Sequence, residues 1–402
     1  MADRRKLRIG VSASVRIAGA LLVLGGLIVG LRVLGPSQFG ISVMLLAVGQ
    51  LLAFPITAME RLLVRLVAQG HGVSAGRVLR RSMSLTFIGL ALAITLVVIA
   101  YLSGKSHWAL YIAASSVTAL SAGIVSLRQG VNRAAGDLFW GQVPNELFRP
   151  LVTLGSYFLA VEISPEWSGL SATVIASAAT LIFVLSGPNL SKVDSHSNDS
   201  QRGVRGAALS LMAISIVVLG VERLYPILLG VASSSTAVAI FAVALRVVQI
   251  ANFTQAFAIF YYSPALAETI QNRPGALGPI TRRIRAMSLL AAIPVAATCI
   301  FLPGLLGSVL APDLNMSGIF PLVALAVVAQ AVGGPSQTAM LMAGRESWVA
   351  VTYIAGSVAS FSAYFLGGAS SAVSATLGLA IAFIFWNGAL VVLGRRTFGA
   401  WH

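Results

Sequence analysis

The stretch that decides the fold class is LTFIGLALAITLVVIAYL, from Leu85 to Leu102, which contains no charged side chain. A helix of this length crosses a hydrocarbon core of about 30 Å. In lipid, backbone groups must be satisfied inside a helix or a closed barrel, and a barrel strand alternates polar and apolar residues over about ten positions. The run shows no alternation, so it predicts a transmembrane helix.

Similar apolar runs recur along the whole chain. Of 402 residues, 57% are hydrophobic and 10% are charged, and the mean hydropathy is +0.89. A soluble domain carries about a quarter charged residues, so the composition excludes a water-soluble globular protein. We therefore predict an all-α integral membrane protein with twelve transmembrane helices. They cover residues 11–34, 39–60, 83–102, 108–127, 145–162, 167–186, 207–231, 236–262, 284–308, 318–342, 348–366 and 371–393.

The formal net charge is +15, but the basic residues are distributed among alternate loops rather than gathered in one patch. This distribution argues against nucleic acid as a partner. If the N-terminus is cytoplasmic, cytoplasmic segments carry 22 of the 27 basic residues and outer loops carry only Lys105. Lys and Arg favour the cytoplasmic side of short loops. The pattern predicts a multi-pass membrane protein with both termini in the cytoplasm. The four remaining basic residues lie within predicted helices: Arg16, Arg32, Arg223 and Arg246.

The sequence lacks the motifs that indicate disulfide bonds, metal binding or the use of ATP. Cys299 is the single cysteine, so neither a disulfide framework nor a metal-binding spacing is present. No Gly-rich phosphate loop occurs, which argues against direct use of ATP. The apolar run after Arg4-Arg5-Lys6 is too long for a signal peptide, and we interpret it as an uncleaved first helix. We expect no cofactor, no metal site and no enzymatic activity.

The hydrophilic loop around residues 191–200 divides the chain into six helices on either side. We predict an N-terminal lobe (1–190), a cytoplasmic linker (191–205) and a C-terminal lobe (206–402). A weak internal echo supports a repeat, because Gln50 falls on Gln249 when the halves are aligned. Repeats of six helices have the same membrane orientation, as in transporters built from parallel repeats.

Short motifs spread over the chain resemble one family. They are RVLGPSQFG (Arg32 to Gly40), RQGVNRAAGDLFWGQVPNELFRPL (Arg128 to Leu151), the segments around Ile227 to Ile250, and Ala343-Gly344-Arg345. With these motifs the chain is similar to the polysaccharide flippases, for O-antigen and exopolysaccharide, of the multidrug/oligosaccharidyl-lipid/polysaccharide exporter superfamily. The resemblance implies two six-helix lobes in a V-shaped fold that moves a lipid-linked oligosaccharide from the inner to the outer leaflet. The drug-exporting branch shares this architecture.

Ionisable residues inside a membrane normally face protein or a water-filled cavity. Glu222 and Arg223 lie about 12 Å below the outer end of their helix, and Arg246 lies at a comparable depth in the next one. Pro226 cannot donate to the carbonyl of Glu222, so a kink is expected there. We predict that Glu222 and Arg246 line one cavity. The alternative is a salt bridge that only holds the two helices together.

Arg246, Gln249 and Asn252 are spaced by three residues and share one helix face. This polar stripe suggests a wet surface that binds cargo, although Gln249 or Asn252 alone could be an interhelical hydrogen-bond partner. Arg16 and Arg32 are about 160° apart on a straight helix, so they cannot both enter one cavity. Either could instead extend to a membrane surface. Gln50 joins the candidates through its match to Gln249.

Arginine suits a cargo with a diphosphate, because guanidinium stays charged and pairs bidentately with phosphate oxygens. The first hypothesis is therefore a flippase for a polyprenyl-diphosphate-linked anionic oligosaccharide, in the bacterial cytoplasmic (inner) membrane. The first alternative is an ion-coupled multidrug or cation exporter of the same fold. A membrane-embedded polymerase or acyltransferase is disfavoured, because outer loops such as 367–371 are too short to build an active site. Expected partners are membrane lipids, a coupling H⁺ or Na⁺, and polysaccharide-assembly proteins.

Overall fold

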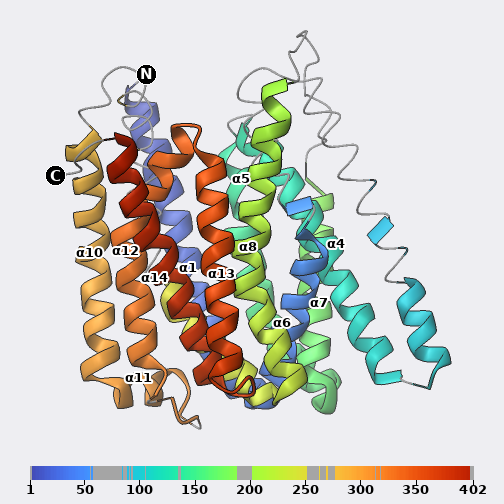
Figure 1. The fold of residues 1–402 in the computed structure, drawn as a ribbon. Helices are drawn as coiled ribbons and strands as arrows, with labels where there is room; N and C mark the ends of the chain where they lie inside the picture. Colours follow the sequence, from blue (N-terminus) through green and yellow to red (C-terminus); the bar gives the residue numbers. More distant parts are fainter. Residues whose placement is uncertain are drawn as a thin grey trace. The chain divides into compact units, whose positions relative to one another are not determined.

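The computed structural model describes residues 2–54, 56, 57, 84, 88, 89, 91, 94–104, 106–134, 137–187, 202–250, 262, 269, 277–312, 314–316 and 318–398. Over these residues the chain forms helices and turns and no strand. The helices, as labelled in Figure 1, are α1 (Ala2–Leu52), α4 (Ser106–Ala134), α5 (Leu138–Val143), a π-helix (Pro144–Phe148), α6 (Arg149–Ile163), a 3₁₀ turn (Pro165–Trp167), α7 (Ser168–Leu185), α8 (Arg202–Ala232), Ser235–Ile250, α10 (Leu277–Phe301), α11 (Pro303–Leu310), α12 (Phe320–Met342), α13 (Glu346–Leu366) and α14 (Ala372–Phe398).

The chain forms two compact units, Met1–Gly230 and Val231–His402. The boundary falls near the end of α8, whereas the sequence suggested a linker at 191–205. Most of that linker lies outside the described residues, although α8 already begins at Arg202. The division into lobes 1–190 and 206–402 stays a prediction.

Helix α1 contains the break that the sequence placed between its first two helices. The apolar part, Ser14–Leu52, has 39 residues, which would extend about 58 Å as one straight helix. At Gly35 the backbone leaves helical geometry, with φ 74° and ψ 163°. The two arms pack closely beside the bend, because a Cβ on Gly30 would lie 2.7 Å from the ring of Phe39. A glycine is needed at Gly35, where side chains rarely adopt a positive φ.

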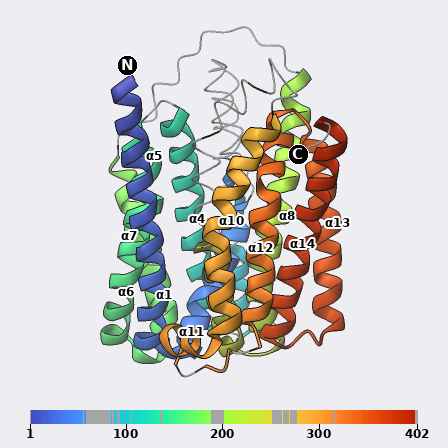
Figure 2. The ribbon, with the colours of Figure 1, turned by 90° about the vertical axis from the view of Figure 1, so that its left-hand side faces the viewer.

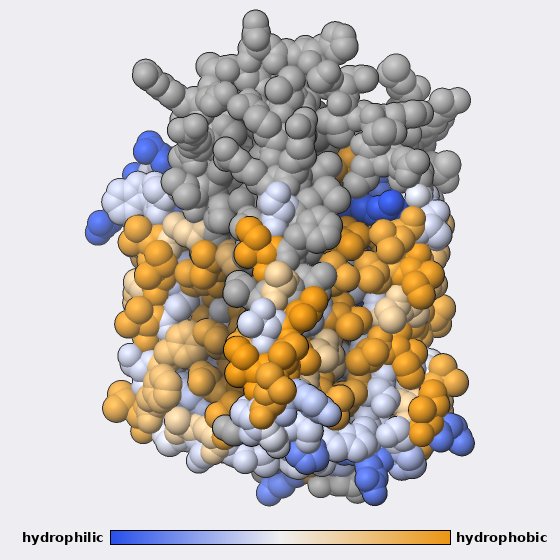
Figure 3. All heavy atoms as spheres, turned by 90° about the vertical axis from the view of Figure 1, so that its right-hand side faces the viewer, coloured by the Kyte–Doolittle hydropathy of each residue, from blue (hydrophilic) through white to orange (hydrophobic). Residues whose placement is uncertain are grey.

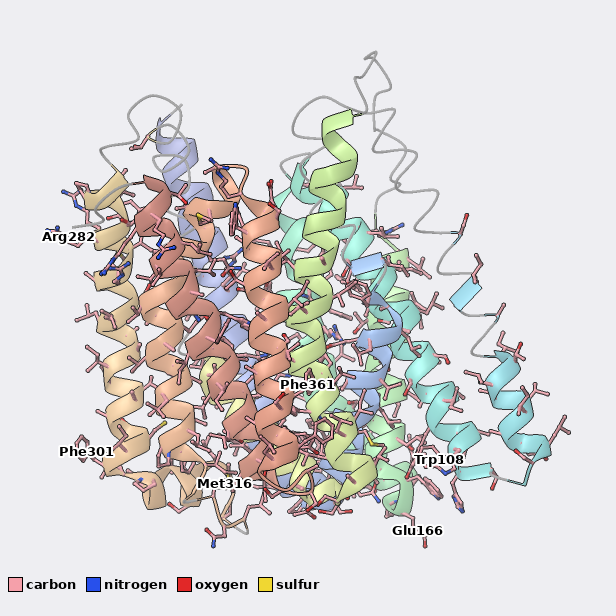
Figure 4. The ribbon with its side chains drawn as sticks, in the orientation of Figure 1. Trp108, Glu166, Arg282, Phe301, Met316 and Phe361 are labelled. Carbon is pink, nitrogen blue, oxygen red and sulfur yellow. The ribbon has the colours of Figure 1, made fainter. Side chains whose placement is uncertain are left out.

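The LGPSQFG motif fastens this bend to the start of α7. The Gln38 side chain donates from Nε2 to the carbonyl of Glu166 (2.7 Å) and accepts from the backbone N–H of Gly169 (3.1 Å). Gly169 is pressed so closely against α1 that a Cβ there would lie 2.0 Å from the Gln38 carbonyl oxygen. Glu166 and Trp108 are labelled at this end of the first unit in Figure 4. The LGPSQFG motif therefore has a structural role, which is to hold the bend of α1 against the start of α7.

Small polar residues hold the remaining helices of the first unit together. Ser42 of α1 hydrogen-bonds to Thr173 of α7 (2.9 Å), and Thr118 of α4 bonds to Ser177 of α7 (3.0 Å). Figure 2 shows α1, α6 and α7 lying side by side. Lipid tails are as apolar as the helices, so the hydrophobic effect does not drive helices together in a membrane. Helices in lipid associate instead through small residues that pack closely and through hydrogen bonds.

The second unit is built on α12 and α14, which pack along each other, with α10 against α12 and α13 against α14. The α12–α14 contact depends on Gly333, because a Cβ there would lie 2.2 Å from the Cβ of Asn387. The α13–α14 contact places Trp386 against Gly356, where its Nε1 donates to the carbonyl of Tyr353 (2.9 Å). Both contacts combine close backbone approach with a satisfied polar group.

Over the described residues, seven helices are long and apolar enough to cross a membrane. Figure 3 shows one face in which hydrophobic residues dominate the middle and hydrophilic residues lie toward the upper and lower margins. The all-α, multi-pass membrane fold is confirmed. Several helix boundaries predicted from sequence were wrong. Helix α4 continues to Ala134, so Arg128 belongs to a helix rather than to a loop, and α10 begins and ends seven residues before the predicted range of 284–308.

Candidate functional site

Helix α8 carries the acidic and basic neighbours singled out in the sequence. Glu222 and Arg223 are half-buried, and Pro226 lies within the helix, three residues further on. The Nε atom of Arg223 is buried and has no hydrogen-bond partner among the described residues. The negative charge of Glu222 stabilises the positive charge of Arg223. The structure thus confirms two opposite charges inside an apolar helix, beside a residue that interrupts its hydrogen bonding.

Arg246 and Gln249 are brought together as the spacing of three predicted. In the helix Ser235–Ile250, Nη1 of Arg246 donates to Oε1 of Gln249 at 2.7 Å. Both residues are half-buried, whereas Val247 and Val248 between them are buried. The bond orients the guanidinium without itself neutralising the charge, because the amide is uncharged. Asn252, the third member of the stripe, lies outside the described residues.

The structure places the α1 candidates in different surroundings. Arg16 is half-buried with its Nε enclosed, and Arg32 is exposed one turn before the bend. Gln50 is half-buried near the end of α1, next to Gly49, which packs on Thr118 of α4. Glu222 and Arg246 belong to different units. Their predicted meeting in one cavity stays a prediction.

The second unit contains a polar group that the sequence analysis missed. Asn387 of α14 donates from Nδ2 to Oε1 of Gln330 in α12 (2.9 Å), and Arg285 of α10 donates from Nε to the carbonyl of Val332 (3.0 Å). Ser336 of α12 is buried, and its Oγ has no partner among the described residues. Gln330 and Asn387 could have been found as isolated amides in apolar helices. Arg285 lies at the start of the predicted helix 284–308 and was counted among the cytoplasmic basic residues, so it was not singled out.

The segment Arg128 to Leu151, which also carried the resemblance, organises one end of the first unit. Arg128 donates to the carbonyl of Val184 in the last turn of α7, where a cation complements the helix dipole. Asp137 caps α5 by accepting from the backbone N–H of Trp140 (3.2 Å). Phe148, in the π-helix, stacks on Phe183 with ring centroids 3.9 Å apart. These contacts are structural, and none of them requires a ligand.

No protein-family model matches the chain, and no curated protein sequence matches it significantly. Solved structures do match over nearly its whole length. An inward-facing multidrug resistance MATE family transporter of the MOP superfamily has a TM-score of 0.66 and 14% identity, covering 97% of this chain and 98% of that one. The fold is that of the MATE and MOP superfamily transporters.

Two further solved structures with the same fold are described as having different functions. The lipid II flippase MurJ, in an inward closed conformation, has a TM-score of 0.58 and 13% identity, covering 95% of this chain and 87% of that one. A MOP superfamily transporter from Pyrococcus furiosus, described as having a binding pocket of reverse polarity that suggests a different function, has a TM-score of 0.53 and 15% identity, covering 98% and 94%. The fold therefore occurs both in multidrug transporters and in a lipid II flippase.

Proposed function

We propose that this protein is a flippase that carries a polyprenyl-diphosphate-linked oligosaccharide, or an exopolysaccharide repeat unit, from the inner to the outer leaflet. The observation that carries the proposal is Arg246, oriented by Gln249 within an otherwise apolar helix. Arg223 supplies a second enclosed guanidinium in α8. A charge at the centre of a bilayer costs about 2.5–3.5 kcal/mol on insertion scales, so such residues are usually functional.

The chemistry of these arginines suits a diphosphate. A guanidinium keeps its charge when it is desolvated, and its planar donors match two phosphate oxygens at once. A cavity with more guanidinium than carboxylate groups lowers the free energy of an anionic head group as it passes the bilayer centre. The protein needs no covalent step for this task, because the cargo crosses the membrane unchanged.

Transport by this fold is proposed to follow alternating access between the two lobes. The predicted helices at 11–34, 39–60, 207–231 and 236–262 would form a portal through which the lipid tail remains in the bilayer. Lobes built from parallel repeats rock against each other around a fixed site in many transporters. In this account Arg246 binds the diphosphate while the sugars occupy the aqueous side of the cavity.

Export of cationic drugs is the second candidate function, favoured by the structural match to a multidrug resistance MATE family transporter. A site for organic cations needs carboxylates, and Glu222 is the intramembrane carboxylate that the sequence offers it. The Pyrococcus furiosus transporter, with its pocket of reverse polarity, argues that polarity rather than fold should decide the cargo. Glu222 would also be the group that couples transport to H⁺ or Na⁺. Membrane lipids and polysaccharide-assembly proteins are proposed partners.

Deletion of the gene should abolish the surface polysaccharide and leave drug sensitivity unchanged, because the cargo is a lipid-linked glycan. The measurement is polysaccharide on intact cells, with minimum inhibitory concentrations of cationic drugs in parallel, before and after complementation. The control is a strain that lacks the first glycosyltransferase for the same glycan, which should share the phenotype without any defect in flipping. Unchanged polysaccharide combined with raised drug sensitivity would favour the exporter.

The proposed orientation places both termini and the 187–206 segment in the cytoplasm and the 367–371 turn outside. Ser370 is exposed in the turn between α13 and α14. A Ser370→Cys variant of a Cys299→Ser background should react with an impermeant thiol reagent in intact cells, whereas Ser195→Cys should react only after lysis. The reverse labelling pattern would show that the orientation is inverted.

A further inference from the structure

In the second unit, α10 and α14 both place arginines at one end, on either side of α12. Arg282, Arg283 and Arg285 lie near the start of α10, and Arg395 and Arg396 lie in the last turn of α14. Helix α12 packs against both helices. Figure 4 labels Arg282 at this end of α10 and Phe301 at the other end. Four of these arginines are exposed, and Arg285 is half-buried.

Arg285 is held in a fixed direction. Its Nε donates to the carbonyl of Val332 in α12 at 3.0 Å. It lies inside the candidate span Gly278–Phe301 rather than in a loop. Among the described residues, the two terminal nitrogens of Arg285 have no hydrogen-bond partner and no carboxylate pairs with them. A positive-inside signal explains an exposed loop arginine, but it does not explain a tethered one inside a span.

The second guanidinium comes from Arg395. It lies close enough to Arg285 for their positive charges to repel each other. Within the part of the chain that the structure describes, Arg395 has no carboxylate partner either. Two like charges brought together from residues 110 positions apart in the sequence repel each other, and an anion between them would remove this unfavourable interaction.

We infer that Arg285 and Arg395 bind the phosphate group of an anionic lipid at the basic end of α10 and α14. Guanidinium pairs bidentately with phosphate oxygens, and basic pockets between transmembrane helices on the cytoplasmic side bind anionic head groups. The phosphate could belong to a membrane phospholipid or to a polyprenyl diphosphate. The inference does not depend on the proposed cargo, because a membrane phospholipid would occupy the site in an exporter as well.

The test is lipid binding to the purified full-length protein in detergent, followed by native mass spectrometry. Phosphatidylglycerol is the first probe, phosphatidylcholine the uncharged control, and inorganic diphosphate the competitor. Loss of a charge-assisted bond predicts about a tenfold weaker binding of phosphatidylglycerol by Arg285→Gln and by Arg395→Gln. Arg283→Gln is the matched control, because it removes an exposed charge two residues away on the same helix; it should change binding by less than about threefold.

Each outcome decides the matter. Equal weakening by Arg283→Gln and Arg395→Gln would mean a diffuse basic surface and would overturn the site, as would equal binding of the two phospholipids by the unchanged protein. Competition by inorganic diphosphate but not by orthophosphate would assign the site to diphosphate-bearing lipids, equal competition by both would assign it to membrane phospholipids, and competition by neither would overturn the site. If Arg285→Gln does not fold, Arg395→Gln still decides, because its side chain is exposed.

Discussion

Replacing Arg246 with alanine should reduce polysaccharide export about ten- to hundredfold while the amount of protein in the membrane stays normal. A charge-assisted contact is worth about 1.5–3 kcal/mol, which sets this range. Arg246→Lys should recover part of the export, because an ammonium keeps the charge and loses the planar fork. The assay is complementation of a deletion strain, scored beside immunoblots of the membrane fraction.

Two further variants separate cargo binding from helix bracing. Gln249→Ala removes the 2.7 Å bond that orients the guanidinium, so export should fall several-fold, by less than in Arg246→Ala. If Arg246 serves only in a salt bridge with Glu222, Arg246→Ala should lower the protein level, and adding Glu222→Ala should restore it. Normal export by Arg246→Ala at a normal protein level would rule out the cargo-binding role.

Gly169→Ala should destabilise the first unit by about 3 kcal/mol, the upper part of the range for overpacking. The added Cβ would lie 2.0 Å from the backbone oxygen of Gln38, which cannot rotate away as a flexible side chain could. Separation of α7 from α1 would also break the 3.1 Å bond from the Gly169 N–H to Gln38. The measurement is the thermal unfolding midpoint of the purified protein in detergent.

Gly155→Ala in α6 is the matched control, because no heavy atom outside its own helix lies within 4 Å of the added Cβ. Its effect should stay within about 0.5 kcal/mol, as for other substitutions that disturb no contact. Equal midpoints for Gly169→Ala and Gly155→Ala would show that the contact between α1 and α7 is not as close as described.

The parts of the fold that hydropathy controls could be predicted from the sequence. Helices α7, α12 and α13 begin and end within two residues of their predicted bounds, because each is a long apolar run between polar or glycine-containing breaks. The bend at Gly35 was also predictable, since a glycine followed by a proline interrupts an apolar stretch too long for one crossing. The spacing of Arg246 and Gln249 correctly placed both on one face.

Features that depend on tertiary contacts could not be predicted from the apolar pattern. Helix α10 begins before its apolar run, so hydropathy placed Arg285 in the first turn of the predicted helix 284–308 rather than about two turns inside it. The bonds between Gln330 and Asn387 and between Arg285 and Val332 join residues about 50 positions apart, and no local period reports them. The π-helix at Pro144–Phe148 has wider turns than an α-helix, so the 3.6-residue period of an α-helix does not predict it.

The central claim concerns the cargo, and the most direct test is translocation by the purified protein in liposomes. A fluorescent polyprenyl-diphosphate oligosaccharide is placed in both leaflets, a proton or sodium gradient is imposed, and the label accessible to an impermeant quencher is followed with time. The account predicts that the unchanged protein moves the inner-leaflet label outward, that Arg246→Ala does not, and that a lipophilic cationic dye is not transported. Transport of the dye with no movement of the lipid-linked oligosaccharide would contradict the account and identify a drug exporter.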